Sequence, residues 1–246
     1  MAGMGTANKD TMTSDGAAVE VSRDLAPTGR LRASINLGNP VLAQGTAGSP
    51  GGVTVDIARE LARRLGLELD LLCFDAARKS VDALASGQAD IGFVAIEPAR
   101  AAQLAFSAPY LLIEGVFVVP QDSPLQSVAD VDQPGVRIGV KQGSAYDLFL
   151  GRTLQHAEVV PGAEGVDVLR ELGLAAGAGI RQPAGAFVRD NPGFRLIDER
   201  FMEIRQAVAT TRDRHPDSVH FLDQAVHELT ATGFIAESLR RSGAGS

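Results

Sequence analysis

The sequence predicts an α/β protein made of two lobes, and three observations predict it. Apolar segments of strand length alternate with amphipathic helical segments from residue 31 to 94 and again from 136 to 198. Two long extended runs, 111–120 and 204–210, bracket the second series. A chain of 246 residues, 45% hydrophobic and 22% charged, is long enough for two small cores. We therefore expect a mixed, mostly parallel sheet flanked by helices in each lobe, joined by two hinge crossings.

The first lobe is expected to begin with an alternating strand, followed by a Gly/Ser/Pro-rich loop through residue 52 and a helix over 54–65. Val55, Leu61 and Leu65 fall on one face of that helix, and Gly66 can end it. The strands expected in this lobe are 31–37, 67–72 and 90–94, and its further helices are 79–85, 218–229 and 235–240. Because the first three strands alternate with helices, they should be parallel, with ligands beyond their carboxyl ends.

The second lobe is expected to repeat this pattern with strands at 136–140, 176–180 and 194–198 and helices at 145–154 and 166–172. The two crossings set the predicted boundaries. The first lobe is residues 29–115 plus 207–243, and the second lobe is residues 116–206.

Residues 1–28 are polar and small, and they contain no apolar segment typical of a signal peptide. We expect them to form a disordered tail. The chain also has no run of about 18 apolar residues, the length that a membrane span requires. As written, the sequence predicts a cytoplasmic protein; removal of a leader before residue 1 would make it periplasmic.

Composition excludes several classes of function. A net charge of −7 and a pI near 5.1 argue against a nucleic-acid partner. Cys73 is the one cysteine, so there is no internal disulfide and no cysteine-based metal cluster. The four histidines share no ligand-like spacing. We expect a monomer without metal or other cofactor.

The stretch 92–110 (GFVAIEPARAAQLAFSAPY) is the most informative part of the chain for function. It passes from a buried strand to a short helical turn started by Pro98, where backbone N–H groups are unpaired and can bind an anion. Arg100 adds a planar fork that matches a carboxylate. A similar corner follows the strand at 136–140, with outward N–H groups expected at Gly143 and Ser144. The alternative is that Arg100 is a surface residue that caps a turn.

Four segments carry a resemblance to a known family: 52–58 (GVTVDIA), 85–90 (ASGQAD), 98–100 (PAR) with 106–110 (FSAPY), and 139–144 (GVKQGS). In this order they resemble the family 3 bacterial extracellular solute-binding proteins, of the periplasmic amino-acid-binding type. The resemblance covers about residues 29–243. It implies the two-lobed type II periplasmic-binding fold, which closes like a hinged clam on a small ligand. It also implies a receptor of an ABC-type uptake system, with the transporter's membrane subunits as further partners.

The family's ligand contacts are only partly present, which makes the chain an atypical member. The arginine that grips the ligand's α-carboxylate corresponds to Arg100, and the second-lobe turn corresponds to Gly143 and Ser144. The hydroxyl residue five positions before the arginine corresponds to Ala95, which cannot donate a hydrogen bond. The aspartate that receives the α-ammonium group has no counterpart at 175–179, and the aromatic lid is replaced at 36–41. The resulting candidate ligand-binding residues are Asn36, Asn39, Phe93, Ala95, Ile96, Arg100, Gly143, Ser144, Arg181 and Gln182.

These losses favour an anionic ligand over an ordinary amino acid. An ammonium group buried without a carboxylate partner would cost several kcal/mol. Arg181 and Lys79 could add positive charge, or they could be solvated charges at the rim. A compensating acid for an ammonium group could come from elsewhere, and Glu97 and Glu114 are the nearest candidates by sequence. We therefore expect small mono- or dicarboxylates to bind better than amino acids.

Two alternative functions remain open at this stage. The same fold hosts the cyclohexadienyl dehydratases, which need a general acid in the site, and Glu97 and Glu114 are the only candidates. The other alternative is a cytoplasmic sensor or scavenger that has no transporter. No nucleophile–base pair is visible, so we expect a binding protein with no catalytic residues.

Overall fold

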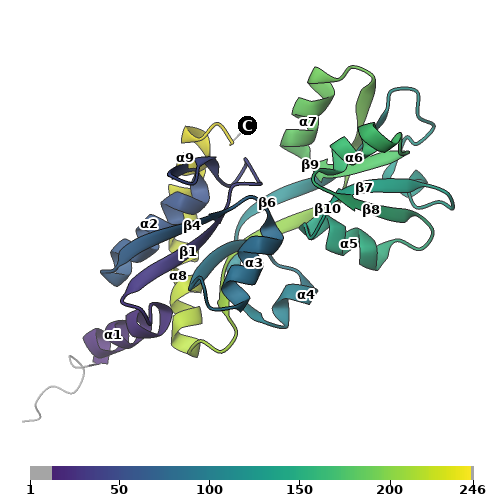
Figure 1. Ribbon diagram of the computed structural model, residues 1–246. Coiled ribbons are helices and arrows are strands. Elements are labelled where there is room, and N and C mark those ends of the chain that lie inside the picture. Colours follow the sequence, from purple (N-terminus) through teal and green to yellow (C-terminus); the bar gives the residue numbers. More distant parts are fainter. Residues whose placement is uncertain (1–12, 245–246) are drawn as a thin grey trace, which may run out of the picture.

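The computed structural model describes residues 13–244 and shows a mixed α/β protein (Figure 1). The helices are α1 (Thr13–Leu25), α2 (Val53–Leu65), α3 (Ala77–Ala85), α4 (Pro98–Ala101), α5 (Ala145–Thr153), α6 (Gly165–Leu172), α7 (Arg181–Asp190), α8 (Pro216–Ala231), α9 (Phe234–Arg241) and the 3-10 helix η1 (Val128–Asp130). The strands are β1 (Arg30–Asn36), β2 (Gln44–Thr46), β3 (Ser49–Gly51), β4 (Glu68–Phe74), β5 (Ile91–Ala95), β6 (Leu104–Pro120), β7 (Arg137–Lys141), β8 (Glu158–Gly162), β9 (Ala176–Ile180) and β10 (Phe194–Thr211).

Eight strands form one hydrogen-bonded ladder in the order β4-β1-β5-β10-β6-β9-β7-β8. The outer strands pair in parallel, whereas β6 and β10 run antiparallel to each other through the centre. The two expected crossings are therefore the middle strands of a continuous ladder. We call the elements before β6, together with α8 and α9, the first half, and the elements between β6 and β10 the second half. Figure 1 shows the two halves at opposite ends of β6 and β10.

Helices cover both faces of the ladder in each half, as the predicted α/β class requires. In the first half, Leu31, Ala33 and Ile35 of β1 pack in one cluster with buried residues of α1, α2, α8 and α9. Ser34 points to the opposite face, where its hydroxyl bonds to Ser80 of α3. In the second half, α6 and α7 bury Leu169 and Ala184 against one face, and α5 covers the other. The strand alternation thus decides which helix each side chain meets.

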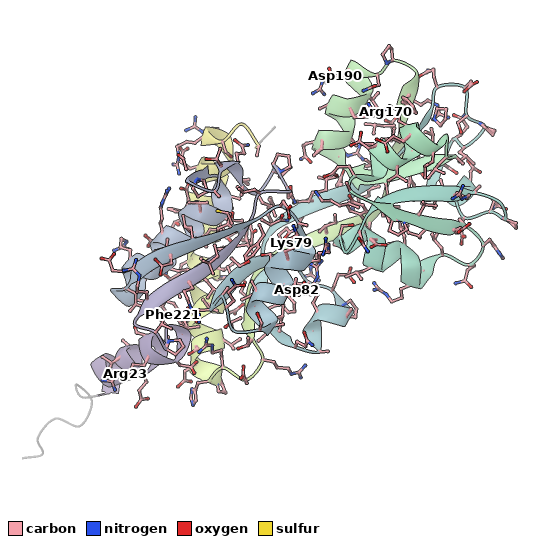
Figure 2. All side chains as sticks on the ribbon, viewed as in Figure 1. Arg23, Lys79, Asp82, Arg170, Asp190 and Phe221 are labelled. Carbon is pink, nitrogen blue, oxygen red and sulfur yellow. The ribbon has the colours of Figure 1, made fainter. Side chains whose placement is uncertain are left out.

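The prediction of a disordered tail through residue 28 is wrong for residues 13–25, which form α1; residues 1–12 lie outside the described part. Val21 and Leu25, four residues apart on one face of α1, are buried in the main core cluster. Phe221 of α8 lies beside this helix (Figure 2) and shares a surface hollow with it. These two apolar residues at helical spacing attach the helix to the core, although the surrounding composition is polar.

The observed helices and strands also differ from the predicted ones where the local sequence pattern is weak. The predicted loop before residue 52 contains the hairpin of β2 and β3, and β8 and α7 were not predicted. Pro183 and Gly185 within α7 disfavour a helix by local propensity, so tertiary packing decides that segment. The predicted strand at 194–198 and the crossing at 204–210 are parts of the 18-residue strand β10. Register shifts near Arg200 and Gln206 mark where β10 bends between the halves.

Candidate functional site

A cavity of about 230 Å³ lies between the two halves, beside the crossing strands. Its wall includes residues at the carboxyl ends of four strands: Asn36 of β1, Ala95 of β5, Lys141 of β7 and Ile180 of β9. This is where the parallel arrangement predicts a ligand site. Most of the remaining wall is apolar, with Leu42, Phe93, Val94, Val166, Pro183, Ala184 and Ile204 among its residues.

The structure brings together half of the predicted site residues. The cavity is lined by Asn36, Asn39, Phe93, Ala95 and Ser144. Ile96, Arg100, Gly143, Arg181 and Gln182 are not among its lining residues. The ligand-binding role of all ten stays a prediction, because position at a cavity wall is not itself binding.

Asn36 and Asn39 shape the loop that closes the cavity from the first half. The Oδ1 of Asn36 accepts from the Gly38 amide at 3.0 Å, and the Oδ1 of Asn39 accepts from the Val41 amide at 3.1 Å. Such turns are typical of asparagine. Each oxygen is partly used within the loop, and the side-chain NH₂ groups are donors suited to a carboxylate.

Arg100 is buried and lies behind the cavity wall. It is 6% exposed, and its guanidinium donates to the carbonyl oxygens of Ala95 and Gly143, each at 3.2 Å. Burial excludes the surface-arginine alternative. Burial also lowers the pKa of Arg100 to about 10, an effect that Glu97 opposes, so the group is still positive at neutral pH. Within residues 13–244 no carboxylate forms an ion pair with it.

The expectation of outward N–H groups at Gly143 and Ser144 is wrong. The Gly143 amide donates to Asp147 Oδ2 at 2.7 Å, and the Ser144 amide donates to the Lys141 carbonyl at 3.1 Å. The Ser144 hydroxyl oxygen accepts from the Asp147 amide, so this turn caps α5. Gly143 has a φ of 71°, the left-handed region that glycine permits. The Gly143 amide is therefore used by Asp147 of α5, and the Ser144 amide is used within the turn.

The other charged residues considered from sequence are also paired elsewhere. Glu97 pairs with Arg152 at 3.0 Å, and Glu114 pairs with Arg181 and Arg200. Lys79, on α3 of the first half (Figure 2), pairs with Asp75 at 2.7 Å.

The ion pairs of Glu97 and Glu114 argue against the dehydratase alternative, which needs one of them as a general acid in the site. The hydrogen bonds from Arg181 and Arg200 lower the pKa of Glu114, the opposite of what a general acid needs. Neither Glu97 nor Glu114 is among the residues that line the cavity.

The prediction did not include five polar residues that line the cavity: Lys141, Gln142, Tyr146, Glu164 and Gln206. The Lys141 Nζ donates to the Gly38 carbonyl at 3.0 Å across the halves, and it also pairs with Glu164. Tyr146 is buried, and burial raises the pKa of its hydroxyl. Lys141 could have been found, because it directly follows the strand predicted at 136–140. Glu164 follows the unpredicted β8, and Gln206 lies within a run interpreted only as a crossing.

Two properties of the described residues concern membrane and metal-dependent functions. No helix between residues 13 and 244 has the length and apolar character needed to cross a membrane. Over the same residues, no three or more His, Cys, Asp or Glu side chains are grouped so that they could hold a metal ion.

The sequence matches the model of the bacterial extracellular solute-binding proteins, family 3, over residues 34–242. It is also similar to the virulence sensor protein BvgS of Bordetella pertussis, with 29% identity over 129 residues. That similarity covers 52% of this chain and 10% of BvgS, so the chain spans about a tenth of the length of this curated relative.

Many solved structures share the fold, among them the following two. One is an amino acid ABC transporter substrate-binding protein, AbpA of Streptococcus pneumoniae, bound to L-arginine; it is 22% identical, the TM-score is 0.73, and 90% of this chain and 98% of AbpA are covered. The other is the ancestral amino-acid-binding protein AncCDT-1, a precursor of cyclohexadienyl dehydratase; it is 18% identical, with a TM-score of 0.71 and 89% and 98% coverage. Both neighbours are binding proteins, and likenesses at this identity establish the fold alone.

Proposed function

The chain belongs to family 3 of the bacterial extracellular solute-binding proteins, and from this membership we propose that it closes on a small carboxylate-bearing solute. In this proposal the lobes are residues 29–115 plus 207–243 and residues 116–206. They approach each other about the middle of β6 and β10. The pairing of β9 with Gly115–Val118 and of β5 with Gln206–Ala209 supports these boundaries, because it places the change of partners there.

The observation that carries the proposal is a positive charge without an ion-pair partner among the described residues, beside the cavity between the two halves. Lys141 in the wall is neutralised by Glu164, but Arg100 behind the wall contacts only carbonyl oxygens among the described residues. A buried charge without a counter-ion is costly, and an anion in the cavity would reduce that cost. The NH₂ groups of Asn36 and Asn39 and one remaining donor of Lys141 can supply hydrogen bonds to it.

The same charges disfavour an ordinary amino acid. The segment 175–179 contains no acid. Glu97 is held by Arg152, Glu114 is held by Arg181 and Arg200, and Glu164 is held by Lys141. An ammonium group would have to displace Lys141 from Glu164 to find a carboxylate. We therefore propose an organic acid as the ligand.

A thermal-shift screen of the twenty amino acids beside a set of small mono- and dicarboxylates tests this proposal, with calorimetry on every hit. We expect stabilisation by at least one organic acid, without turnover. Arg100→Ala should weaken its binding by about 1–3 kcal/mol, less than the roughly 2–5 kcal/mol for a direct buried pair, because the guanidinium lies behind the wall. Arg59→Ala, which removes an exposed arginine of α2 paired with Asp56, is the matched control. Strong stabilisation by amino acids alone would overturn the proposal.

We further propose that the protein acts outside the cytoplasm as the receptor of an ABC-type uptake system. A second candidate is a ligand-sensing module, which the similarity to the sensor BvgS favours. Uptake of a labelled ligand by cells with and without the gene separates the two roles. Lost uptake supports the receptor, whereas unchanged uptake with a lost transcriptional response to the ligand supports the sensor.

A further inference from the structure

The charged groups of the cavity gather around Gly38, in the loop that follows β1. The Lys141 Nζ donates to the Gly38 carbonyl and pairs with Glu164. The Asn36 Oδ1 accepts from the Gly38 amide, and Asn39 is the next residue of the chain. All five of these residues line the cavity, and among the residues between 13 and 244 only Lys141 and Glu164 line it with a charged side chain. The charge at the cavity wall is therefore concentrated at one place.

An apolar wall from the second half lines the same cavity. It consists of Val166 at the start of α6, Gly179 and Ile180 at the end of β9, and Pro183 and Ala184 in α7. A Cβ placed on Gly179 would meet Ala184 Cβ at 3.5 Å and Val166 Cγ1 at 3.9 Å, so these three residues are direct neighbours. Val166, Ile180 and Pro183 are only partly buried. Apolar surface therefore remains on this wall that a ligand can cover.

The first half and the central strand β10 add apolar groups to the cavity. Leu42, Phe93 and Val94 line it from the first half, and Ile204 lines it from β10. Each of these four residues is at most 2% exposed, so the protein core fixes its position. A ligand between the halves would thus meet hydrocarbon from both of them.

This distribution limits the chemistry of the ligand beyond its carboxylate. A second carboxylate would lose water without gaining a counter-ion, because Lys141 is paired with Glu164 and Arg181 is paired with Glu114. Hydrocarbon gains from the same surroundings, about fourfold in affinity for each buried methylene group. The cavity of about 230 Å³ is smaller than the sites of drug-sized ligands, so the hydrocarbon part must be small.

We propose, on the basis of the proposed carboxylate-binding function, that the ligand is a small monocarboxylate with an apolar body. Its carboxylate binds near Gly38, where Lys141 and the two asparagines supply hydrogen-bond donors, and its hydrocarbon part covers the apolar wall. Val166 then acts as a specificity-determining residue, because it favours a hydrocarbon group over a charged one.

Calorimetry on the full chain with acids of matched shape tests this inference. Propionate carries a hydrogen where succinate carries a second carboxylate and isocaproate carries an isopropyl group, which is similar in shape to a carboxylate. Leucine is isocaproate with an added ammonium group. Isocaproate should bind about 10- to 100-fold more tightly than propionate, because three further carbon atoms are buried. It should also bind at least about tenfold more tightly than succinate or leucine, whose added charge has no partner in the cavity.

Val166→Thr replaces one methyl group of the apolar wall by a hydroxyl group of almost the same size. It should reduce the preference for isocaproate over succinate about 3- to 10-fold. Val160→Thr is the matched control, because Val160 of β8 is partly buried and packs against the same core cluster as Val166 but does not line the cavity. It should keep the preference. Circular dichroism checks that both variants are folded, and if Val166→Thr fails to fold, Val166→Ala with Val160→Ala as its control serves as the same test.

The outcomes separate this inference from the proposed function. Propionate or succinate binding as tightly as isocaproate, or a preference preserved in Val166→Thr, overturns this inference while carboxylate binding stands. Binding of no organic acid by the native protein overturns the proposed function itself, and so does binding of leucine alone.

Discussion

The side chains of Lys141 and Arg100 both lie beside the cavity, but they have different hydrogen-bond and ion-pair partners. Lys141 has Glu164 as its counter-ion, and the Gly38 carbonyl completes its contacts from the other half. Arg100 has the carbonyl oxygens of Ala95 and Gly143, which orient the guanidinium but do not neutralise it. In the proposed function, the arginine would supply the charge for an anionic ligand, and the lysine and the asparagines would supply the direct contacts.

Glu60 on α2 is expected to make stability depend on acid pH. Arg63 and Arg64 donate hydrogen bonds to its carboxylate at 2.7–2.9 Å. The bond from Arg63 is the largest cause that lowers the pKa of Glu60 from 4.5 to about 2, against an opposing effect of burial. Because the folded pKa is depressed, this contribution is present above the unfolded pKa and is lost as the pH falls towards 2.

Urea denaturation between pH 7 and pH 2 measures the effect. Glu60→Gln should lower the free energy of unfolding by about 1–2 kcal/mol at pH 7, a figure reduced for partial solvent screening. The difference from the native protein should shrink towards pH 2. Glu68→Gln, at a glutamate whose side chain is 79% exposed, is the control and should have little effect at any pH. A difference between native protein and Glu60→Gln that does not vary with pH would contradict the pairing.

At the scale of elements, α1 is a helix that the polar composition of residues 1–28 did not predict. Its buried residues meet α8 and α2 in the core, and the Ser22 hydroxyl donates to the Leu65 carbonyl at 3.1 Å. Asp24 accepts from the His215 amide at 3.0 Å at the start of α8. These contacts join the beginning of the described chain to its end. We therefore expect α1 to be an integral part of the first half.

Leu25→Ala tests that expectation. Leu25 is fully buried, so truncation should lower the free energy of unfolding by about 2–5 kcal/mol through lost burial and a cavity. Val19→Ala on the same helix should change it by less than about 0.5 kcal/mol, because Val19 is 48% exposed. Chemical denaturation followed by circular dichroism gives both values. Equal and small effects would mean that α1 does not stabilise the fold.

At the scale of the whole molecule, three cations link the two halves. Lys141 reaches Gly38, Arg100 reaches Gly143, and Arg152 of α5 pairs with Glu97. Glu97 is 3% exposed, and its carboxylate forms an ion pair with Arg152 at 3.0 Å. A buried carboxylate without its partner is costly, and separation of the halves would return it to water.

Arg152→Ala should therefore shift the protein towards an open arrangement. We expect a larger radius of gyration in solution scattering and about 3- to 30-fold weaker ligand binding, since the closed state becomes less populated. Arg240→Ala removes an arginine that pairs only with Glu237 within α9 and should leave both measurements unchanged. An unchanged radius and affinity in Arg152→Ala would show that the Glu97 pair does not hold the halves together.

The sequence by itself determined the α/β class, the order of most strands and helices, the two crossings and the family. The fold class and the order of elements depend on hydrophobic periodicities of 2 and 3.6 residues and on turn residues. Both signals lie within short segments of the sequence. The sequence also predicted a ligand site at the carboxyl ends of the strands, because parallel connectivity implies that location. Asn36, Asn39 and Phe93 were predicted as ligand-binding residues from their positions at or near these strand ends. Each of them lines the cavity.

Only the tertiary structure decided which polar groups are already paired. Arg100 meets a carbonyl 43 residues away, and the Gly143 amide is taken by Asp147 of α5. Gln206 lies between β5 and β6 because β10 is inserted there, although β10 is far from β5 in the sequence. Hydrogen-bond partners are chosen by the packing of distant segments, and a local pattern identifies a donor or an acceptor without specifying what it meets.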